Sequence, residues 1–277
     1  MTSTASPTLS VNVSDDGHVV EVELHHGRAN EMGRAQLDEW QALCSRLEAG
    51  PARALITYSR RRSAKGTPIF ISGADVTERR GWEDDAVRAH VRWQREVLAR
   101  LRHAPVLHVA VVHGVALGWG TEFLLTADYR ITTPEAVYGL PETGIGIVPG
   151  AGGTSELWST IGVAQALRLG MTGERLGAEE ALRIGLVQES VADVDLGLAR
   201  ARALAAAVAR RSPTAVAAFK AGVLASVGLP AEARAELEAR AYEHCVDSGD
   251  AAVGRASFER ITAGEEVAWS ARRSFSP

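Results

Sequence analysis

Cysteine is scarce in this sequence of 277 residues. Its two cysteines, Cys44 and Cys245, lie far apart, and neither belongs to a Cys-x-x-Cys or Cys/His pattern. Disulfide frameworks and structural zinc sites both require clusters of such residues. We therefore expect two free, buried thiols and no metal site.

Long apolar runs and an excess of basic charge are also missing. The most apolar stretches, 105–118 and 201–209, are shorter than the ~20 residues that a membrane-spanning helix needs. The first ten residues, MTSTASPTLS, carry neither the basic start nor the apolar core of a signal peptide. With a formal net charge of −4, the chain offers no basic surface for nucleic acid. We expect a cytoplasmic protein that binds neither membranes nor nucleic acid.

Strand-like and helix-like patterns alternate along most of the chain. Residues 18–26, 53–59 and 106–114 have the apolar patterns of strands, and residues 34–49 and 83–102 have the 3.6-residue period of amphipathic helices. A short helix is expected over 121–127 and two short strands within 128–140. The pattern after residue 150 is mostly helical, and residues 195–277 are expected to be helical throughout. Such alternation is typical of an α/β fold.

Three glycine-containing turns each join an apolar strand to the start of a helix. They are FISGADV (70–76), HGVALGWGTEF (113–123) and LPETGIGIVPGAGGT (140–154). Unpaired N–H groups at two facing helix N-termini would bind a developing oxyanion. Carboxylates on the second and third turns, Glu122 and Glu142, could then move protons to and from carbon beside a carbonyl group. Spacing alone also allows a purely structural role for these glycines.

The same turns resemble the motifs of a known family, the crotonase (enoyl-CoA hydratase/isomerase) superfamily. ISGADV resembles its AGAD loop, and HGVALGWGTEFLLTADYRI resembles its G-x-A-x-G-G-G-x-E segment with the D-x-R-I that follows. YGLPETGIGIVPGAGGT and MTGERLGAEEALRIGLVQESV resemble the next two family segments in the same order. The similarity extends from about residue 18 to about residue 262 and so covers nearly the whole chain.

The resemblance implies a fold, a division into two parts and an assembly. The fold is α/β, a crotonase-type ββα spiral with a helical C-terminal trimerisation region. Residues 1–195 would form the spiral core with the active site, and residues 196–277 the helical region for oligomerisation. The family's assemblies imply a homotrimer or a dimer of trimers.

The resemblance also implies a reaction and the residues that perform it. The backbone N–H groups of Ala74 and Trp119 would form an oxyanion hole that stabilises a thioester enolate. Glu122 and Glu142 match the pair that holds one water in the family's hydratases, whereas its isomerases generally keep only the second glutamate. The expected activity is therefore addition or removal of water across the α,β-double bond of an acyl-CoA thioester.

Coenzyme A would be part of the substrate, and no permanently bound cofactor is expected. The family's substrate pocket corresponds here to Arg28, Ala29, Asn30, Ser72, Gly73, Asp75, Val76, Gly118, Gly120, Pro141 and Gly144. The basic cluster Arg60, Arg61, Arg62 and Lys65 is available for phosphates, but a charged run in a loop is more often solvated surface. His113, at a strand end, is expected to be a hydrogen-bonded turn residue and not a base.

Trp119 departs from the family pattern, which has glycine at that position. Backbone donation does not require glycine, so the oxyanion hole can persist while the indole occupies or covers the acyl pocket. Alternative functions stay open at this point. They are isomerisation, carbon–carbon bond hydrolysis of a β-diketone without coenzyme A, in relatives that carry histidine where this chain has Glu142, and a non-enzymatic scaffold or RNA-binding role.

Overall fold

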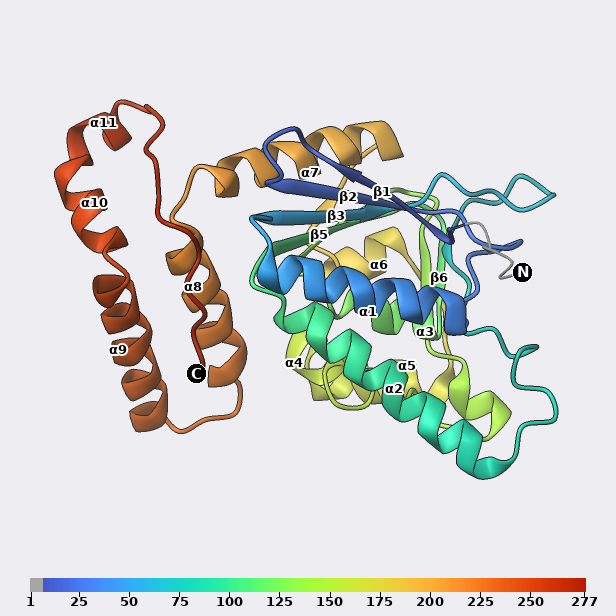
Figure 1. Ribbon diagram of the computed structural model, residues 1–277. Coiled ribbons are helices and arrows are strands. Elements are labelled where there is room, and N and C mark those ends of the chain that lie inside the picture. The colour runs from blue at the N-terminus through green and yellow to red at the C-terminus, as the bar shows by residue number, and fades with distance from the viewer. Residues whose placement is uncertain (1–6) are drawn as a thin grey trace, which may run out of the picture.

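The computed structural model describes residues 7–277, which form an α/β core and a helical arm (Figure 1). Six strands form the main sheet, in the order β1-β2-β3-β5-β7-β10. Their bounds are β1 (Leu9–Val13), β2 (Val19–Leu24), β3 (Ala54–Tyr58), β5 (Leu107–Val112), β7 (Tyr129–Thr132) and β10 (Glu189–Ser190). The β1–β2 pair is antiparallel and the other pairs are parallel.

A smaller second sheet has the order β4-β6-β8-β9. It consists of β4 (Ile69–Ile71), β6 (Val115–Leu117), β8 (Val137–Gly139) and β9 (Leu176–Gly177). The first three strands run parallel to one another, whereas β9 is antiparallel to β8. Each of the three parallel strands leads directly into one of the glycine-containing turns. The chain thus alternates between the two sheets, as in the expected spiral.

Helices cover both faces of the main sheet because its central strands are apolar on both faces. In β3, Ile56 faces α7 (Val194–Ala209), whereas the neighbouring Leu55 faces the core beneath α1 (Arg34–Ala49). Alternation of side chains along a strand produces this division. Figure 1 shows α7 and α1 on opposite sides of the sheet, with α2 (Asp84–His103) beside α1.

Short helices complete the core around the second sheet. They are α3 (Trp119–Leu124), the 3₁₀ helix η1 (Glu142–Ile145), α4 (Leu157–Ile161), α5 (Val163–Thr172) and α6 (Ala178–Arg183). The predicted positions of the longer strands and helices are confirmed to within a few residues. Four strands, β1, β6, β9 and β10, were not predicted, and three of them have two or three residues, too few to show a period.

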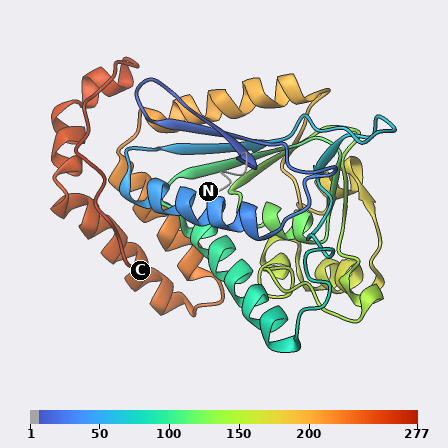
Figure 2. The ribbon, with the colours of Figure 1, turned by 45° about the vertical axis from the view of Figure 1, so that its right-hand side comes forward.

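The helical arm consists of α8 (Pro213–Ser226), α9 (Ala231–Asp247), α10 (Asp250–Ala256) and α11 (Phe258–Thr262). Figures 1 and 2 show α9 and α10 on the far side of α8 from the core. Among residues 7–277, no helix is both long enough and apolar enough to cross a membrane.

The prediction that residues 195–277 are helical throughout is wrong, because the last helix ends at Thr262. Gly264 has a φ of +81°, and the chain then runs back along the arm to the core (Figure 1). There the Arg272 guanidinium donates to the carbonyl oxygens of Leu47 (2.6 Å) and Gly50 (3.0 Å). The end of α1 has carbonyl groups without helical partners, and this arginine satisfies them in place of a further helix.

Candidate active site

The three glycine-containing turns meet at one edge of the second sheet. They follow β4, β6 and β8, which are neighbouring parallel strands. The carboxyl ends of parallel strands lie at the same edge, so residues 72–76, 118–122 and 140–146 come together there. The sheet order therefore brings together the three segments on which the sequence-based site was predicted.

Gly120 sets how closely α3 approaches β4. A Cβ atom at position 120 would lie 2.2 Å from the carbonyl oxygen of Ile71, the last residue of β4. No other residue type fits this contact without a backbone shift. The missing side chain lets the start of α3 lie against the turn that carries Ala74.

The backbone N–H groups of Ala74 and Trp119 are both free of secondary-structure pairing. Ala74 lies opposite Met32 in a parallel bridge whose hydrogen bonds are made by the residues on either side of Ala74. Met32 N–H donates to the carbonyl oxygen of Gly73 (2.9 Å), and Asp75 N–H donates to the carbonyl oxygen of Met32 (2.8 Å). The intervening Ala74 N–H therefore points away from Met32. Trp119 is the first residue of α3, where N–H groups have no helical acceptor.

Glu122 is nearly inaccessible, with 3% of its surface exposed. Its Oε1 accepts hydrogen bonds from the N–H groups of Ala151 (2.7 Å) and Gly153 (2.9 Å). Burial nevertheless raises the pKa of the carboxyl to about 7, with a smaller upward effect from Glu142. Since Oε1 is engaged by the backbone, Oε2 is the oxygen left for a reacting molecule.

Glu142 is half-buried at the start of η1, and burial raises its pKa as well. Its Oε2 is buried and has no hydrogen-bond partner. Its Oε1 lies beside Gly118, where a Cβ atom would approach it to 2.6 Å. Gly118 also has a φ of +53°, which side chains other than glycine rarely adopt. The missing side chain of Gly118 thus leaves room for the Glu142 carboxylate.

One cavity of about 640 Å³ brings these groups together. Its walls include Glu122 and Glu142, with Ala74 and Trp119 from the turns that face them. The helix α2 contributes Val87, Val91 and Gln94 to the walls. A volume of this size is typical of a site for a small organic molecule. One buried and one half-buried carboxyl group, both with raised pKa values, thus lie on one cavity with Ala74 and Trp119, an arrangement suited to proton transfer.

The Trp119 ring is 2% exposed and stacks on Phe123, with 5.6 Å between ring centroids and 27° between planes. It belongs to the apolar core beneath the cavity, although the residue also lines the cavity. Its indole Nε1 is buried without an acceptor. The ring is thus mainly a core side chain at the edge of the cavity.

Asn30 was predicted in the substrate pocket, and its side chain is 1% exposed. Nδ2 donates to the carbonyl oxygens of Leu24 (3.2 Å) and Phe70 (2.8 Å) and to Ser59 Oγ (2.9 Å). These bonds join the ends of β2, β3 and β4. Its position next to the AGAD-like turn is as expected, but its amide nitrogen is occupied by this structural role.

The other predicted pocket residues are not among those that line the cavity with the glutamates. Ala29 accepts a hydrogen bond from Ser72 N–H (3.1 Å), which places the two segments side by side, and Gly73 adjoins them. Asp75 is engaged with the N–H and hydroxyl groups of Thr77. The following are exposed on the surface: Arg28, Val76, Pro141 and Gly144.

The basic cluster is largely occupied by contacts within the protein. Arg60 pairs with Asp195, and Arg61 donates to the carbonyl oxygen of His25 (3.1 Å). Arg62 contacts His113 Nε2 (3.2 Å), whose Nδ1 contacts Thr133 Oγ1 (3.0 Å). His113 is thus a hydrogen-bonded turn residue, in agreement with the sequence-based expectation.

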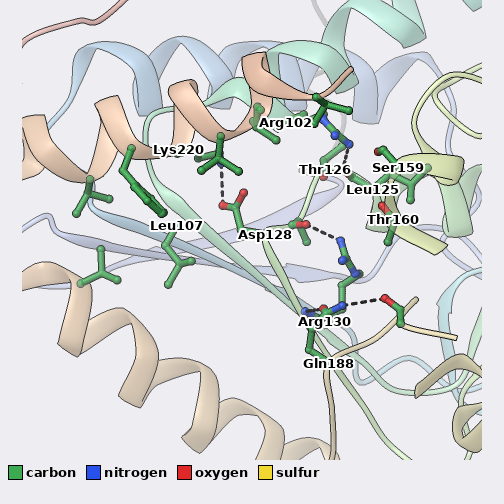
Figure 3. Close-up of a pocket in the computed structure, with 18 of the residues that line it drawn as sticks. Arg102, Leu107, Leu125, Thr126, Asp128, Arg130, Ser159, Thr160, Gln188 and Lys220 are labelled. Atoms are coloured by element: carbon green, nitrogen blue, oxygen red, sulfur yellow. Dashed lines mark hydrogen bonds and ion pairs between the residues drawn. The ribbon is translucent and has the colours of Figure 1, made fainter. Parts of the chain in front are cut away.

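A second cavity, of about 760 Å³, lies between α8 and the core (Figure 3). Lys220 of α8 donates to Asp128 Oδ2 (2.8 Å) across it. Apolar side chains of α8, including Phe219 and Val223, form one wall of this cavity. Neither Glu122 nor Glu142 lines this cavity.

Arg79 and Gln94 also line the cavity with the glutamates, and neither was predicted from the sequence. Arg79 lies in an ordinary charged run, TERR, and Gln94 is one of several polar residues of an amphipathic helix. The only signal in the sequence was the segment between the AGAD-like turn and α2, because this segment has to run close to the site.

Comparisons with known proteins agree with this architecture. The family model described as enoyl-CoA hydratase/isomerase matches residues 19–263. YngF of Bacillus subtilis (strain 168) is 38% identical over 194 residues, which cover 70% of this chain and 74% of that protein. The mitochondrial enoyl-CoA hydratase domain-containing protein 2 of Mus musculus is 34% identical, with 87% and 81% of the two chains covered.

Solved structures show the same fold. An enoyl-CoA hydratase from Bacillus anthracis superimposes with a TM-score of 0.86 at 31% identity, covering 96% of this chain and all of that one. AtuE of Pseudomonas aeruginosa gives a TM-score of 0.82 at 30% identity, with 92% and 97% covered. The α/β crotonase-type spiral predicted from the sequence is thereby confirmed. The chain belongs to the enoyl-CoA hydratase/isomerase family.

Proposed function

We propose that this protein is an enoyl-CoA hydratase that adds water to, or removes it from, the α,β-double bond of an acyl-CoA thioester. The observation that carries the proposal is the single cavity shared by Glu122, Glu142, Ala74 and Trp119. Family membership supports an acyl-CoA substrate. Coenzyme A enters and leaves with the acyl group.

The N–H groups of Ala74 and Trp119 serve as the oxyanion hole. Both are unpaired, and both belong to turns at the same edge of the second sheet. When they donate to the thioester oxygen, they stabilise the enolate that forms as water adds. Each such donor contributes roughly 2.7–4 kcal/mol to the lowering of the barrier.

The two glutamates share the proton transfers. One carboxylate takes a proton from water as the water oxygen bonds to the β-carbon, and the double-bond electrons move to the thioester oxygen. The other, protonated carboxyl group then gives its proton to the α-carbon. Burial raises both pKa values, so one carboxyl group can hold a proton near neutral pH while the other is ionised.

The presence of two glutamates on one cavity favours hydration over isomerisation, because isomerisation needs only one group to carry a proton from one carbon to another. A β-diketone hydrolase is favoured less, since Glu142 stands where those relatives carry histidine. Both alternatives predict products that differ from a hydration product.

The arm favours assembly into a homotrimer or a dimer of trimers. Phe219 of α8, Tyr242 of α9 and Phe258 of α11 are 74%, 72% and 65% exposed. An interface with further copies of the chain would remove such side chains from water. Phe219 lines the cavity beside Lys220, so a second copy that covers this side chain would also close that cavity.

Incubation with enoyl-CoA thioesters of four to ten carbons, followed by mass spectrometry, tests the reaction. Hydration adds the mass of one water, whereas isomerisation leaves the mass unchanged and moves the double bond. A hydrated product supports the proposal. Exclusive isomerisation, or cleavage of a free β-diketone with no turnover of any thioester, would contradict it.

A further inference from the structure

Several unpartnered polar atoms belong to residues that line the cavity with the two glutamates. Buried polar side-chain atoms without a hydrogen-bond partner occur on four of the residues that line it: Arg79, Gln94, Trp119 and Glu142. Most buried polar groups in proteins are hydrogen-bonded, and each unpaired one costs about 1–3 kcal/mol. Three of the four residues, all but Glu142, present N–H donors, so the cavity is short of acceptors.

Arg79 is the cation among these four residues. Its Nε and Nη2 are buried without partners, and no carboxylate of residues 7–277 lies within ion-pair distance of it. Its acidic neighbours are engaged elsewhere. Asp75 accepts from Thr77, and Glu78 Oε2 accepts from Arg34 N–H (3.0 Å). A guanidinium group partly removed from water and left unpaired is costly, which a bound anion would offset.

The side-chain amide of Gln94 is an uncharged donor on a residue that lines the same cavity. Gln94 is 3% exposed, and its Nε2 has no acceptor. Arg92 and Arg95 of α2 also line the cavity, and neither forms an ion pair with another of residues 7–277. The buried His90, next to this region, has its pKa lowered to about 4, mainly by burial and then by Arg79 and Arg34. Arg79, Arg92 and Arg95 thus add positive charge to the walls of the cavity.

We propose that the acyl group of the substrate carries a second carboxylate, which Arg79 binds with Gln94 as an additional donor. This inference rests on the proposed acyl-CoA reaction and names its substrate class: monothioesters of short unsaturated dicarboxylic acids. A guanidinium group donates two parallel hydrogen bonds to a carboxylate. Because Arg79 lines the same cavity as Glu122 and Glu142, its anion belongs near the reacting carbons. The phosphates of coenzyme A lie at the far end of the pantetheine arm.

Such a carboxylate would fix the direction of the acyl chain. The thioester oxygen is held at Ala74 and Trp119, and the carboxylate is held at Arg79, so the double bond between them is aligned with the two glutamates. Uncharged chains would lack the second anchor and leave the Arg79 charge unpaired. The site therefore discriminates against them.

Binding of unreactive saturated thioesters tests this substrate class without requiring turnover. Isothermal titration calorimetry would compare butanoyl-CoA with pentanedioyl-CoA, which carries the terminal carboxylate. We expect the native protein to bind pentanedioyl-CoA at least ~10-fold more tightly, as one charge-assisted pair allows. Arg79→Met should weaken only pentanedioyl-CoA, by ~10- to 100-fold. Arg80→Met, a change to the exposed neighbouring arginine, is the matched control and should leave both affinities unchanged.

Thioesters of N-acetylcysteamine with the same two acyl groups separate the acyl carboxylate from the phosphates, because they contain no phosphate. A preference for the dicarboxylic acyl group that persists there, and is lost in Arg79→Met, supports the proposal. An equal loss of both CoA thioesters in Arg79→Met would assign the arginine to phosphate and overturn the proposal. Equal affinities of the native protein for the two acyl groups would overturn it even if the variant does not fold.

Turnover distinguishes this inference from the proposed reaction. If pentanedioyl-CoA is preferred but the corresponding enedioic thioester gains no water, the hydratase proposal fails while the carboxylate site stands. If uncharged enoyl thioesters are hydrated and dicarboxylic ones are not preferred, the hydratase proposal stands and the carboxylate site fails.

Discussion

Gly118 and Glu142 are so close that a Cβ atom at position 118 would come within 2.6 Å of the Glu142 Oε1 atom. The first residue ends the turn after β6, and the second begins the 3₁₀ helix after β8. The missing side chain thus leaves room for a carboxylate next to Trp119, to which we assign an oxyanion donor. In the motif GWGTEF, Gly118 leaves room for Glu142, and Gly120 leaves room for the carbonyl oxygen of Ile71.

Gly118→Ala should therefore reduce activity more than it reduces folding. The contacting atom is the end of a flexible side chain, so Glu142 can move away, and the φ of +53° adds strain of roughly 1–2 kcal/mol. We expect a fall in kcat of at least ~100-fold, with the protein still folded. Steady-state kinetics and a thermal melt measure the two effects. Gly170→Ala, where an added Cβ meets nothing within 4 Å, is the control. A full-rate Gly118→Ala variant would contradict this role.

Glu122→Gln and, separately, Glu142→Gln should each lower turnover by orders of magnitude while leaving thioester affinity roughly intact. Both carboxyl groups act on the water and its proton, whereas binding depends on the oxyanion donors and the acyl pocket. Kinetics on the best substrate, with calorimetry on an unreactive thioester, separate the two quantities. If either variant keeps the native turnover, its assigned catalytic role is wrong.

Burial of Glu122 should make stability fall as pH rises through the acidic range. Its pKa is about 7 in the folded protein against 4.5 for an unperturbed glutamate, so between these limits the folded chain keeps a proton that the unfolded chain has lost. The free energy of unfolding then decreases with pH, by an amount on the order of 3 kcal/mol, and is constant above the folded pKa. Glu122→Gln should lose this slope. Urea denaturation of both proteins at about pH 5 and about pH 8 gives the comparison. Parallel pH dependences would refute the effect.

Trp119→Gly should both destabilise the protein and broaden the range of acyl chains. The ring is buried against Phe123, so its loss should cost at least about 3 kcal/mol. The backbone donor remains, so some activity should persist. Relative rates on four-carbon and longer enoyl thioesters decide whether the ring selects substrate. An unchanged ratio would mean that Trp119 acts only through packing.

The exposed apolar side chains of the arm should hold the protein as a trimer or hexamer. Phe219→Glu places a charge on the surface that we assign to the partner, and it should shift the mass toward the monomer. Multi-angle light scattering at micromolar concentration measures this shift, with the change of another exposed arm residue, Glu236→Gln, as control. A native protein that is monomeric at that concentration would rule out the assembly.

The sequence alone determined the local elements and the three turns. The periods of 34–49 and 83–102 predicted α1 and α2 closely, because an amphipathic face repeats several times within each helix. The turns could be located because glycine, proline and glutamate stand at fixed offsets from apolar strands. The resemblance of these turns to a known family supplied the fold and the glutamate pair.

Tertiary structure alone decided what surrounds Glu122 and Glu142. The order β4-β6-β8 brings the three turns to one edge, and that order depends on pairing between strands far apart in the chain. The direction of the Trp119 ring was open because packing on Phe123 competes with a position in the cavity. The return of the chain after Thr262 depends on Arg272 and the carbonyl groups at the end of α1, more than 220 residues earlier in sequence. Arg79 stands out only because no acceptor reaches it, and the absence of a partner is a property of three-dimensional packing.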